Sequence, residues 1–202
     1  MSWTALLPFK PPAQRKTRLA GLLDPEQRIA LSAVMFDGVV AALERSESIG
    51  AIHLIAADRP DGWTGGWHAD RGRGLNAELE AVRDTIGGPL LILHADLPLL
   101  GSEDVGALLV AAERAGRAIA PDRHGRGTNA VALYDDRPFL FQFGVASFPA
   151  HVGQGRAARV DRIGLALDID SPDDLAEAVA AGFAMPGRSG RSGQAGRLGE
   201  AE

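Results

Sequence analysis

Three aspartates follow apolar stretches of the chain, at points where their carboxylates could bind a divalent cation. Asp96 comes directly after the run at 90–95, while Asp168 ends a second run that starts at Gly164, and Asp170 follows two residues later. A short apolar run is typical of a strand buried on both faces of a parallel sheet, and ligands bind beyond the carboxyl ends of such strands. Alternate residues of a strand share a face, so Asp168 and Asp170 should lie together and repel each other unless a cation separates them. Taken alone, Asp96 could equally cap a turn.

Basic residues follow the first predicted strand, residues 4–9. Lys10, Lys16 and Arg18 form a basic loop in a chain of 202 residues whose formal net charge is −5. Lysine offers a point charge and arginine a planar fork of donors, so this loop suits a polyphosphate. The alternative is a basic loop that is only solvated.

A glycine-rich segment precedes the helix predicted from Asn76. Residues 58–74 contain two tryptophans and little apolar periodicity, and the segment ends at Gly74. Glycines before a helix allow backbone N–H groups to approach an anion or the edge of a base. This is not a P-loop, because no Gly-Lys-Ser/Thr follows.

Two later segments offer further donors for an anion. Residues 121–129 combine two glycines with cationic side chains, an amide and the hydroxyl of Thr128, which is the donor set of an anion pocket. In the aromatic segment 139–148, Gly144 is followed by Ser147 shortly before a predicted helix, which indicates a second phosphate site. The alternative for this segment is an aromatic core with a turn in it.

Strands and helices alternate along the chain, which predicts a three-layer α/β/α domain with a mostly parallel, mixed sheet. The Asp-Pro-Glu-Gln and Ser-Pro-Asp-Asp sequences at 24–27 and 171–174 are typical helix starts. We expect one domain over residues 1–185 and a disordered Gly/Ser/Arg-rich tail over 186–202. The predicted strands are 4–9, 51–57, 90–95, 117–120, 130–134 and 164–168, and the predicted helices are 25–45, 76–86, 105–116, one near 147, and 175–182.

The composition excludes several classes of protein. The negative net charge argues against nucleic acid as a partner, and the absence of cysteine removes disulfides and thiolate chemistry. No apolar run approaches the ~20 residues that cross a bilayer, and the first residues lack the layout of a signal peptide. We therefore expect a cytoplasmic protein without a membrane partner. The aromatic segment 139–148 could serve the interface of a homodimer.

Several segments, in the same order, match one family of nucleotidyltransferases. They are LPFK with KTRL (7–19), DPEQR (24–28), GLN (74–76), HADLPLL (94–100), APDRHGRGTNA (120–130), FGVASF (143–148), His151 and LDIDSPDDL (167–175). With these segments the sequence resembles the 2-phospho-L-lactate guanylyltransferase family of deazaflavin-coenzyme biosynthesis, which includes phosphoenolpyruvate and 3-phospho-D-glycerate guanylyltransferases. The resemblance covers about residues 4–182 and implies a nucleotide-diphospho-sugar transferase (Rossmann-like) architecture.

The resemblance also implies a reaction and a set of site residues. GMP would pass from GTP to the phosphate of a small phospho-acid, namely 2-phospho-L-lactate, phosphoenolpyruvate or 3-phospho-D-glycerate, and pyrophosphate would leave. By likeness, the residues are Asp96, Asp168 and Asp170 for catalysis and two Mg²⁺ ions; Lys10, Lys16, Arg18, Gly74 and Asn76 for the nucleotide; and Thr128, Gly144 and Ser147 for the acceptor phosphate.

Two other functions stay open at the level of sequence. One is a nucleotidyltransferase with another acceptor or with CTP. The other is a nucleotide-binding protein without catalysis, although three retained aspartates argue against it. A Rossmann oxidoreductase has little support, because no G-x-G-x-x-G follows the first predicted strand.

Overall fold

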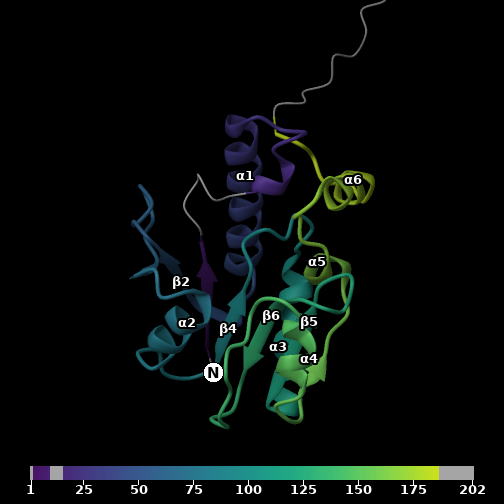
Figure 1. Ribbon diagram of the computed structural model, residues 1–202. Coiled ribbons are helices and arrows are strands. Elements are labelled where there is room, and N and C mark those ends of the chain that lie inside the picture. The colour runs from purple at the N-terminus through teal and green to yellow at the C-terminus, as the bar shows by residue number, and fades with distance from the viewer. Residues whose placement is uncertain (1, 10–15, 187–202) are drawn as a thin grey trace, which may run out of the picture.

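The computed structural model describes residues 2–9 and 16–186, and within them the strands form one sheet of seven. The sheet order is β3-β2-β1-β4-β6-β5-β7 (Figure 1). β6 runs antiparallel to both of its neighbours, and the other pairings are parallel. This confirms the predicted mostly parallel, mixed sheet. The strands are β1 Trp3–Pro8, β2 Ile49–Ala56, β3 Gly66–Ala69, β4 Leu90–Leu93, β5 Arg117–Pro121, β6 Thr128–Leu133 and β7 Ala158–Arg159.

Helices cover both faces of the sheet, which confirms the three layers. One core lies between the sheet and α1, α3 and α5, and it contains Val39, Leu108 and Leu165. The core on the opposite face contains Leu79 of α2, Phe148 of α4 and the phenylalanines of the segment between β6 and α4. The helices are α1 Pro25–Glu44, α2 Leu75–Arg83, α3 Ser102–Ala115, α4 Ser147–Val152, α5 Ile163–Ala166 and α6 Pro172–Ala180, with a short 3₁₀ helix, η2 Thr17–Leu19.

A third apolar cluster joins the early and late parts of the chain. Leu19 of η2 and Met35 of α1 pack with Leu167, Ile169 and Leu175 near the start of α6. In Figure 1 α1 and α6 accordingly lie together in the upper part of the view, toward which β1 and β4 point. This cluster brings the Asp168–Asp170 segment to the carboxyl ends of the parallel strands.

The helix starts predicted from sequence are confirmed. The Asp24 carboxylate accepts the Gln27 N–H at 2.8 Å, and the Gln27 side chain accepts the Asp24 N–H at 3.0 Å. Ser171 caps α6 in the same way with Asp174. Such reciprocal caps satisfy two backbone donors at the first turn of each helix.

The predicted strand at 164–168 is wrong, because the chain forms α5 there. Periodicity cannot distinguish a short buried strand from a short buried helix, and the surroundings decide. Gly164 packs so tightly against Asp104 that a Cβ atom would lie 2.0 Å from its carboxylate. Asn129 donates to the Leu165 and Ala166 carbonyls, at 3.0 and 3.1 Å, which are free to accept because the helix ends there.

Two short edge strands were not predicted. β3 lies within the segment 58–74 that sequence indicated as a loop, and β7 has only two residues. A strand of two to four residues is too short to show a periodic pattern, and the glycine at the start of β3 weakens the signal further.

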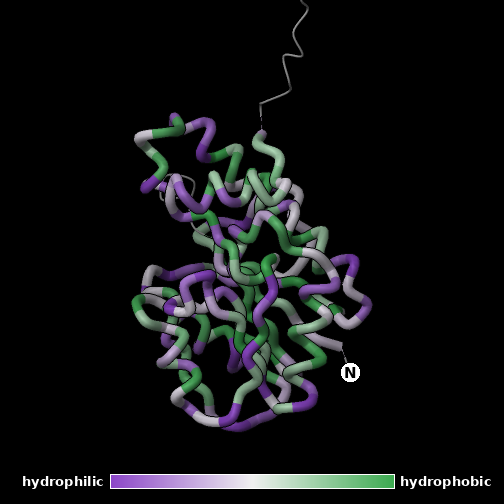
Figure 2. The backbone as a smooth tube through the Cα atoms, turned by 90° about the vertical axis from the view of Figure 1, so that its right-hand side faces the viewer, coloured by the Kyte–Doolittle hydropathy of each residue, from purple (hydrophilic) through white to green (hydrophobic). Residues whose placement is uncertain are grey.

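Hydrophobic segments run mainly through the body of the molecule and hydrophilic segments mainly along its rim (Figure 2). Among the described residues, none of the helices combines the length and the apolar character that a membrane span requires. The predicted tail, 186–202, lies outside the described residues except for Pro186, and the single domain over 1–185 stays a prediction.

Candidate active site

The carboxyl ends of four neighbouring parallel strands border a cavity of about 820 Å³. Asp70 follows β3, Ala57 follows β2, Phe9 follows β1, and the His94–Asp96 segment follows β4. Asp168 and Asp170 line the same cavity from the segment before α6. This is the position at which open α/β sheets bind ligands.

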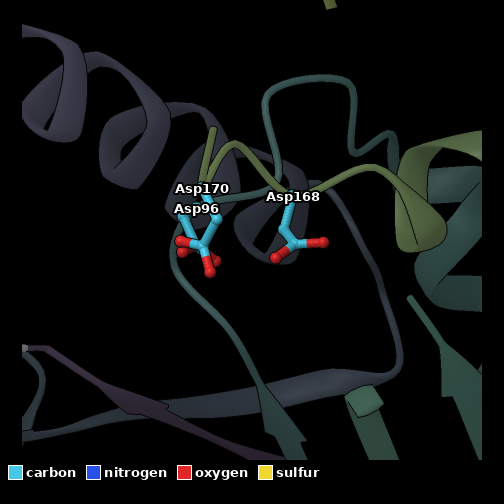
Figure 3. A group of neighbouring side chains, drawn as sticks. All are labelled: Asp96, Asp168 and Asp170. Carbon is cyan, nitrogen blue, oxygen red and sulfur yellow. The ribbon is translucent and has the colours of Figure 1, made fainter. Parts of the chain in front are cut away.

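The three predicted aspartates meet at one end of this cavity. One carboxylate oxygen from each lies within 4.8 Å of the others, and Figure 3 shows the side chains projecting in the same direction from two chain segments. The Ile169 N–H donates to the Asp96 carbonyl at 3.3 Å, which joins the two segments. The structure therefore brings the three aspartates together, although Asp168 does not lie on the strand that was predicted for it, and their binding of a cation stays a prediction.

Lys16 inserts its ammonium group between two of these carboxylates. Its Nζ lies 2.5 Å from Asp96 Oδ2 and 3.2 Å from Asp170 Oδ1, and its side chain is 7% exposed. Burial alone would lower the pKa of Lys16, but the charges of Asp96 and Asp170 outweigh burial and raise it. Burial would likewise raise the pKa of Asp96, but Lys16 holds it below the usual value. Arg18 adds a longer ion pair to Asp170 at 3.6 Å.

Asp168 lacks such a cationic partner among the described residues. Burial, and then the charge of Asp96, raise the pKa of Asp168 to about 6. Asn129 donates to Asp168 Oδ1 at 3.2 Å, and Asp96 Oδ1 is buried without a hydrogen-bond partner in the part of the chain that the structure describes. Crowded carboxylates with an unpaired buried oxygen are a donor set suited to a hard cation such as Mg²⁺.

A bulge in β6 directs two consecutive side chains to different groups. Ala130 pairs with Ala120 and Thr128 pairs with Pro121, so Asn129 is the extra residue. A bulge of this kind changes the direction of a side chain at the end of a strand. Asn129 consequently contacts Asp168, while the Thr128 hydroxyl lies 3.0 Å from His151 Nδ1 on α4.

His151 is a residue to which sequence gave no role. It is 1% exposed, and its Nε2 accepts the Gln142 N–H at 2.9 Å. Burial lowers the pKa of His151 to about 4, so the ring is neutral near pH 7. A neutral ring that accepts at Nε2 carries its proton on Nδ1, and His151 therefore donates to Thr128.

The other predicted acceptor residues lie next to this pair. The Ser147 N–H donates to the Gly144 carbonyl at 3.3 Å. Ser147 is buried and precedes His151 by one helical turn, so both are on the same side of α4. Among the described residues that line the cavity, Thr128, Gly144 and Ser147 are absent. His94 does line the cavity, and its ring lies 5.3 Å from the Phe143 ring of the same aromatic segment.

The predicted nucleotide residues have different surroundings. Lys16, Arg18 and Gly74 line the cavity, whereas Lys10 lies outside the described residues. The Asn76 side chain exchanges two hydrogen bonds with the Phe143 backbone, at 2.8 and 3.1 Å. This pairing fixes the aromatic segment to α2, and contact of Asn76 with a nucleotide stays a prediction.

Glu78 is a further buried acid that sequence did not single out. Its carboxylate accepts the N–H groups of Arg71 and Arg73, at 2.9 and 3.1 Å, and pairs with the Arg73 side chain at 2.6 Å. The hydrogen bond from the Arg73 side chain, with the other contacts, lowers the pKa of Glu78 to about 2. Glu78 thereby fixes the loop that ends at Gly74.

Comparisons with known proteins agree with this geometry. The family described as "Guanylyl transferase CofC like" matches residues 3–188. A phosphoenolpyruvate guanylyltransferase of Sphaerobacter thermophilus is 37% identical in an alignment of 207 positions, which covers 94% of this chain and 97% of the relative. A 2-phospho-L-lactate guanylyltransferase of Methanoregula boonei is 34% identical over 88% of this chain and 82% of the relative.

The fold is shared with solved structures at much lower identity. A Desulfovibrio desulfuricans chain described as a nucleotide-diphospho-sugar transferase superposes with a TM-score of 0.75 at 16% identity, over 95% of this chain and 92% of that one. This likeness confirms the predicted architecture.

Proposed function

This chain belongs to the family of CofC-like guanylyl transferases, and we propose that it transfers GMP from GTP to the phosphate of a small phospho-acid. The acceptor candidates are phosphoenolpyruvate, 2-phospho-L-lactate and 3-phospho-D-glycerate. The first two are named in relatives at 37% and 34% identity. The product would serve deazaflavin-coenzyme biosynthesis, as the resemblance of the sequence implies.

The observation that carries this proposal is the carboxylate cluster at the end of the cavity. Three acids with ligand atoms within 4.8 Å, next to the buried ammonium of Lys16, concentrate both signs of charge at one place. A phosphoryl-transfer site needs this arrangement, because the reacting groups are anions that must be brought together.

The acceptor phosphate needs no activated nucleophile from the protein. One of its oxygens attacks the α-phosphorus of GTP, a P–O bond forms, and the bond from the α-phosphorus to the bridging oxygen breaks as pyrophosphate leaves. The protein contributes orientation and neutralisation of charge. Thr128, Gly144 and Ser147 would hold the acceptor phosphate, and Lys16 and Arg18 would bind the phosphates of GTP.

Asp96, Asp168 and Asp170 would hold Mg²⁺. The unpaired Asp96 Oδ1 and the raised pKa of Asp168, caused by burial and the charge of Asp96, support a cation at this cluster. When bound, Mg²⁺ would neutralise the negative charge that gathers on the phosphates during transfer. Asn129 fixes one oxygen of Asp168, which leaves the other oxygen for a ligand.

The direct test is pyrophosphate release with Mg²⁺, one nucleotide and one phospho-acid at a time. We expect release only when GTP and one of the three acids are both present, with ATP and CTP much slower. Discrimination among these acids rests on one small substituent, and such a group is worth ~1–3 kcal/mol. All three must therefore be compared at equal concentration. Absence of release with every pairing, despite GTP binding, would favour a non-catalytic nucleotide-binding protein.

A further inference from the structure

We propose that the Asp70 carboxylate binds the Watson–Crick edge of guanine and thereby selects GTP among the nucleoside triphosphates. This inference rests on the proposed function, because it assigns the base of the nucleotide whose phosphates lie at the aspartate cluster. Asp70 lines the cavity but was not among the residues that the sequence indicated.

The position of Asp70 matches the length of a nucleotide. Asp96 follows β4 and Asp70 follows β3, so they lie at opposite ends of the strand series β3-β2-β1-β4 that borders the cavity. Neighbouring strands are ≈ 4.8 Å apart, and three spacings amount to about 14 Å. This is of the order of the length of a nucleoside from its 5′ phosphate to the far edge of its base. With the phosphates at Asp96, the base reaches Asp70.

The backbone fixes Asp70 in this place. Its N–H donates to the Ala56 carbonyl at 2.9 Å, which extends the pairing of β3 with β2 by one residue. Its Oδ1 accepts the Gly72 N–H at 2.8 Å. The carboxylate is therefore held at the end of a strand and does not move with a free loop.

The other acid at this end of the cavity, Glu78, is already neutralised. Glu78 is 1% exposed, and both of its oxygens accept hydrogen bonds from the Arg71–Arg73 segment. Asp70 is partly exposed, and no described residue donates to its Oδ2. Asp70 is therefore the acid that retains a free acceptor oxygen for a base.

A carboxylate distinguishes guanine from the other common bases by its hydrogen-bonding pattern. Guanine presents two adjacent donors, N1–H and the 2-amino group, and a carboxylate accepts both. Adenine N1 and cytosine N3 are acceptors, so each would face the negative charge of Asp70 without a proton between them. A site that pairs with specific donors rejects analogues strongly, because its own polar group is otherwise left unpaired.

A purely local role for Asp70 is the competing explanation, since its Oδ1 closes the turn to Gly72. Asparagine forms the same turn through its own Oδ1. Asp70→Asn therefore keeps the turn and removes only the charge and the second acceptor. An asparagine amide matches xanthine, in which a carbonyl replaces the 2-amino group while N1–H remains.

The experiment measures binding of GTP, XTP, ATP and CTP to the full chain by calorimetry with Mg²⁺, together with pyrophosphate release. For Asp70→Asn we expect GTP binding to weaken about 10–100-fold, in line with loss of a charge-assisted hydrogen bond, and XTP to bind better than GTP. Asp70→Ser, which also keeps the turn, should lose GTP preference without gaining XTP. Asp61→Asn, on the exposed part of the preceding loop, is the matched control and should resemble the original chain.

The outcomes separate this inference from the proposed function. If the original chain prefers GTP and both Asp70 variants, folded as judged by thermal melting, retain its affinity and base preference, Asp70 does not bind guanine. If the original chain shows no preference for GTP, the proposed function fails and this inference fails with it.

Discussion

The aspartate cluster and the Thr128–His151 pair differ in how fully their charges and hydrogen bonds are satisfied. At the aspartate cluster, like charges are crowded together, Asp96 Oδ1 accepts no hydrogen bond from residues 2–9 or 16–186, and the pKa of Asp168 is raised to about 6 by burial and the charge of Asp96. The Thr128–His151 pair joins two buried side chains, and the His151 ring, which is neutral near pH 7, also accepts a hydrogen bond from the Gln142 N–H.

The difference follows from what each group has to bind. A site for a cation needs unsatisfied negative charge, and such charge lowers the stability of the fold until the ligand arrives. A group that orients one hydroxyl needs a fixed geometry, and satisfied hydrogen bonds together with aromatic packing provide it. Asp168, the member of the cluster whose pKa is raised, should therefore contribute to activity at the expense of stability, and the Thr128–His151 pair should contribute to both.

The largest effect is expected for Asp168→Asn. Loss of one carboxylate should reduce kcat by about 10²–10³-fold, the usual size of a lost electrostatic contact at a transition state. Because the pKa of Asp168 is raised by burial and by Asp96, the free energy of unfolding near pH 7 should stay the same or increase. Steady-state kinetics and chemical denaturation measure both quantities.

Asp37→Asn is the control, because Asp37 is exposed on α1 away from the cavity. This variant should change neither quantity. A marked loss of stability in Asp168→Asn would show that the aspartate cluster supports the fold, and the contrast between the two groups would then disappear.

The second effect concerns the pH dependence of stability. Burial lowers the pKa of His151 from 6.5 to about 4 in the folded chain. Between about pH 6.5 and 4 the His151 imidazole is protonated in the unfolded chain but neutral in the folded chain. The free energy of unfolding therefore decreases as the pH falls through this range. The shift corresponds to a loss on the order of 2–3 kcal/mol.

His151→Gln should lack this part of the pH dependence while being less stable at pH 7. His124→Gln is the matched control, because His124 is exposed. If the original chain and His151→Gln lose stability in parallel between pH 6.5 and 4, His151 is not held neutral by the fold.

The sequence predicted one side of this comparison better than the other. Asp96, Asp168 and Asp170 were singled out because carboxylates after apolar runs are a local signal, and the structure places them together, while their role stays a prediction. The position of Asp168 was nevertheless predicted from a strand that does not form. The cluster depends instead on the buried Ile169 and its hydrogen bond to Asp96, which are tertiary contacts.

The role of His151 could not be predicted from sequence. Its partner Thr128 is 23 residues away and faces it only because β6 has a bulge at Asn129. A single extra residue in a strand reverses the direction of the next side chain, and no periodic pattern marks it. The edge strand β3, which places Asp70, was also missed, since the four residues of Gly66–Ala69 are too few to give a periodic signal.

A third, smaller effect tests the function of the Thr128–His151 pair. Thr128→Val keeps the shape of the side chain but removes the hydroxyl, and it leaves the His151 N–H without an acceptor. We expect KM for the phospho-acid to rise about 10–100-fold, while KM for GTP changes little. Thr128→Ser, which keeps the hydroxyl, should restore most of the affinity. An equal rise of both KM values in Thr128→Val would assign Thr128 to the general stability of the site.

The smallest effect is expected for Arg18→Ala, at the exposed margin of the aspartate cluster. The Arg18 side chain is 76% exposed, and its ion pair with Asp170 is long, at 3.6 Å. Exposed pairs of this kind contribute little to stability, so the free energy of unfolding should not change measurably. Removal of one positive charge near the phosphates should raise KM for GTP a few-fold, and added salt should reduce the difference from the original chain.

Arg114→Ala, on the exposed surface of α3 and away from the cavity, is the control. Lys16 is buried between two carboxylates, whereas Arg18 is exposed. A loss of stability in Arg18→Ala would therefore show that Arg18, as well as Lys16, neutralises the charge of the aspartate cluster.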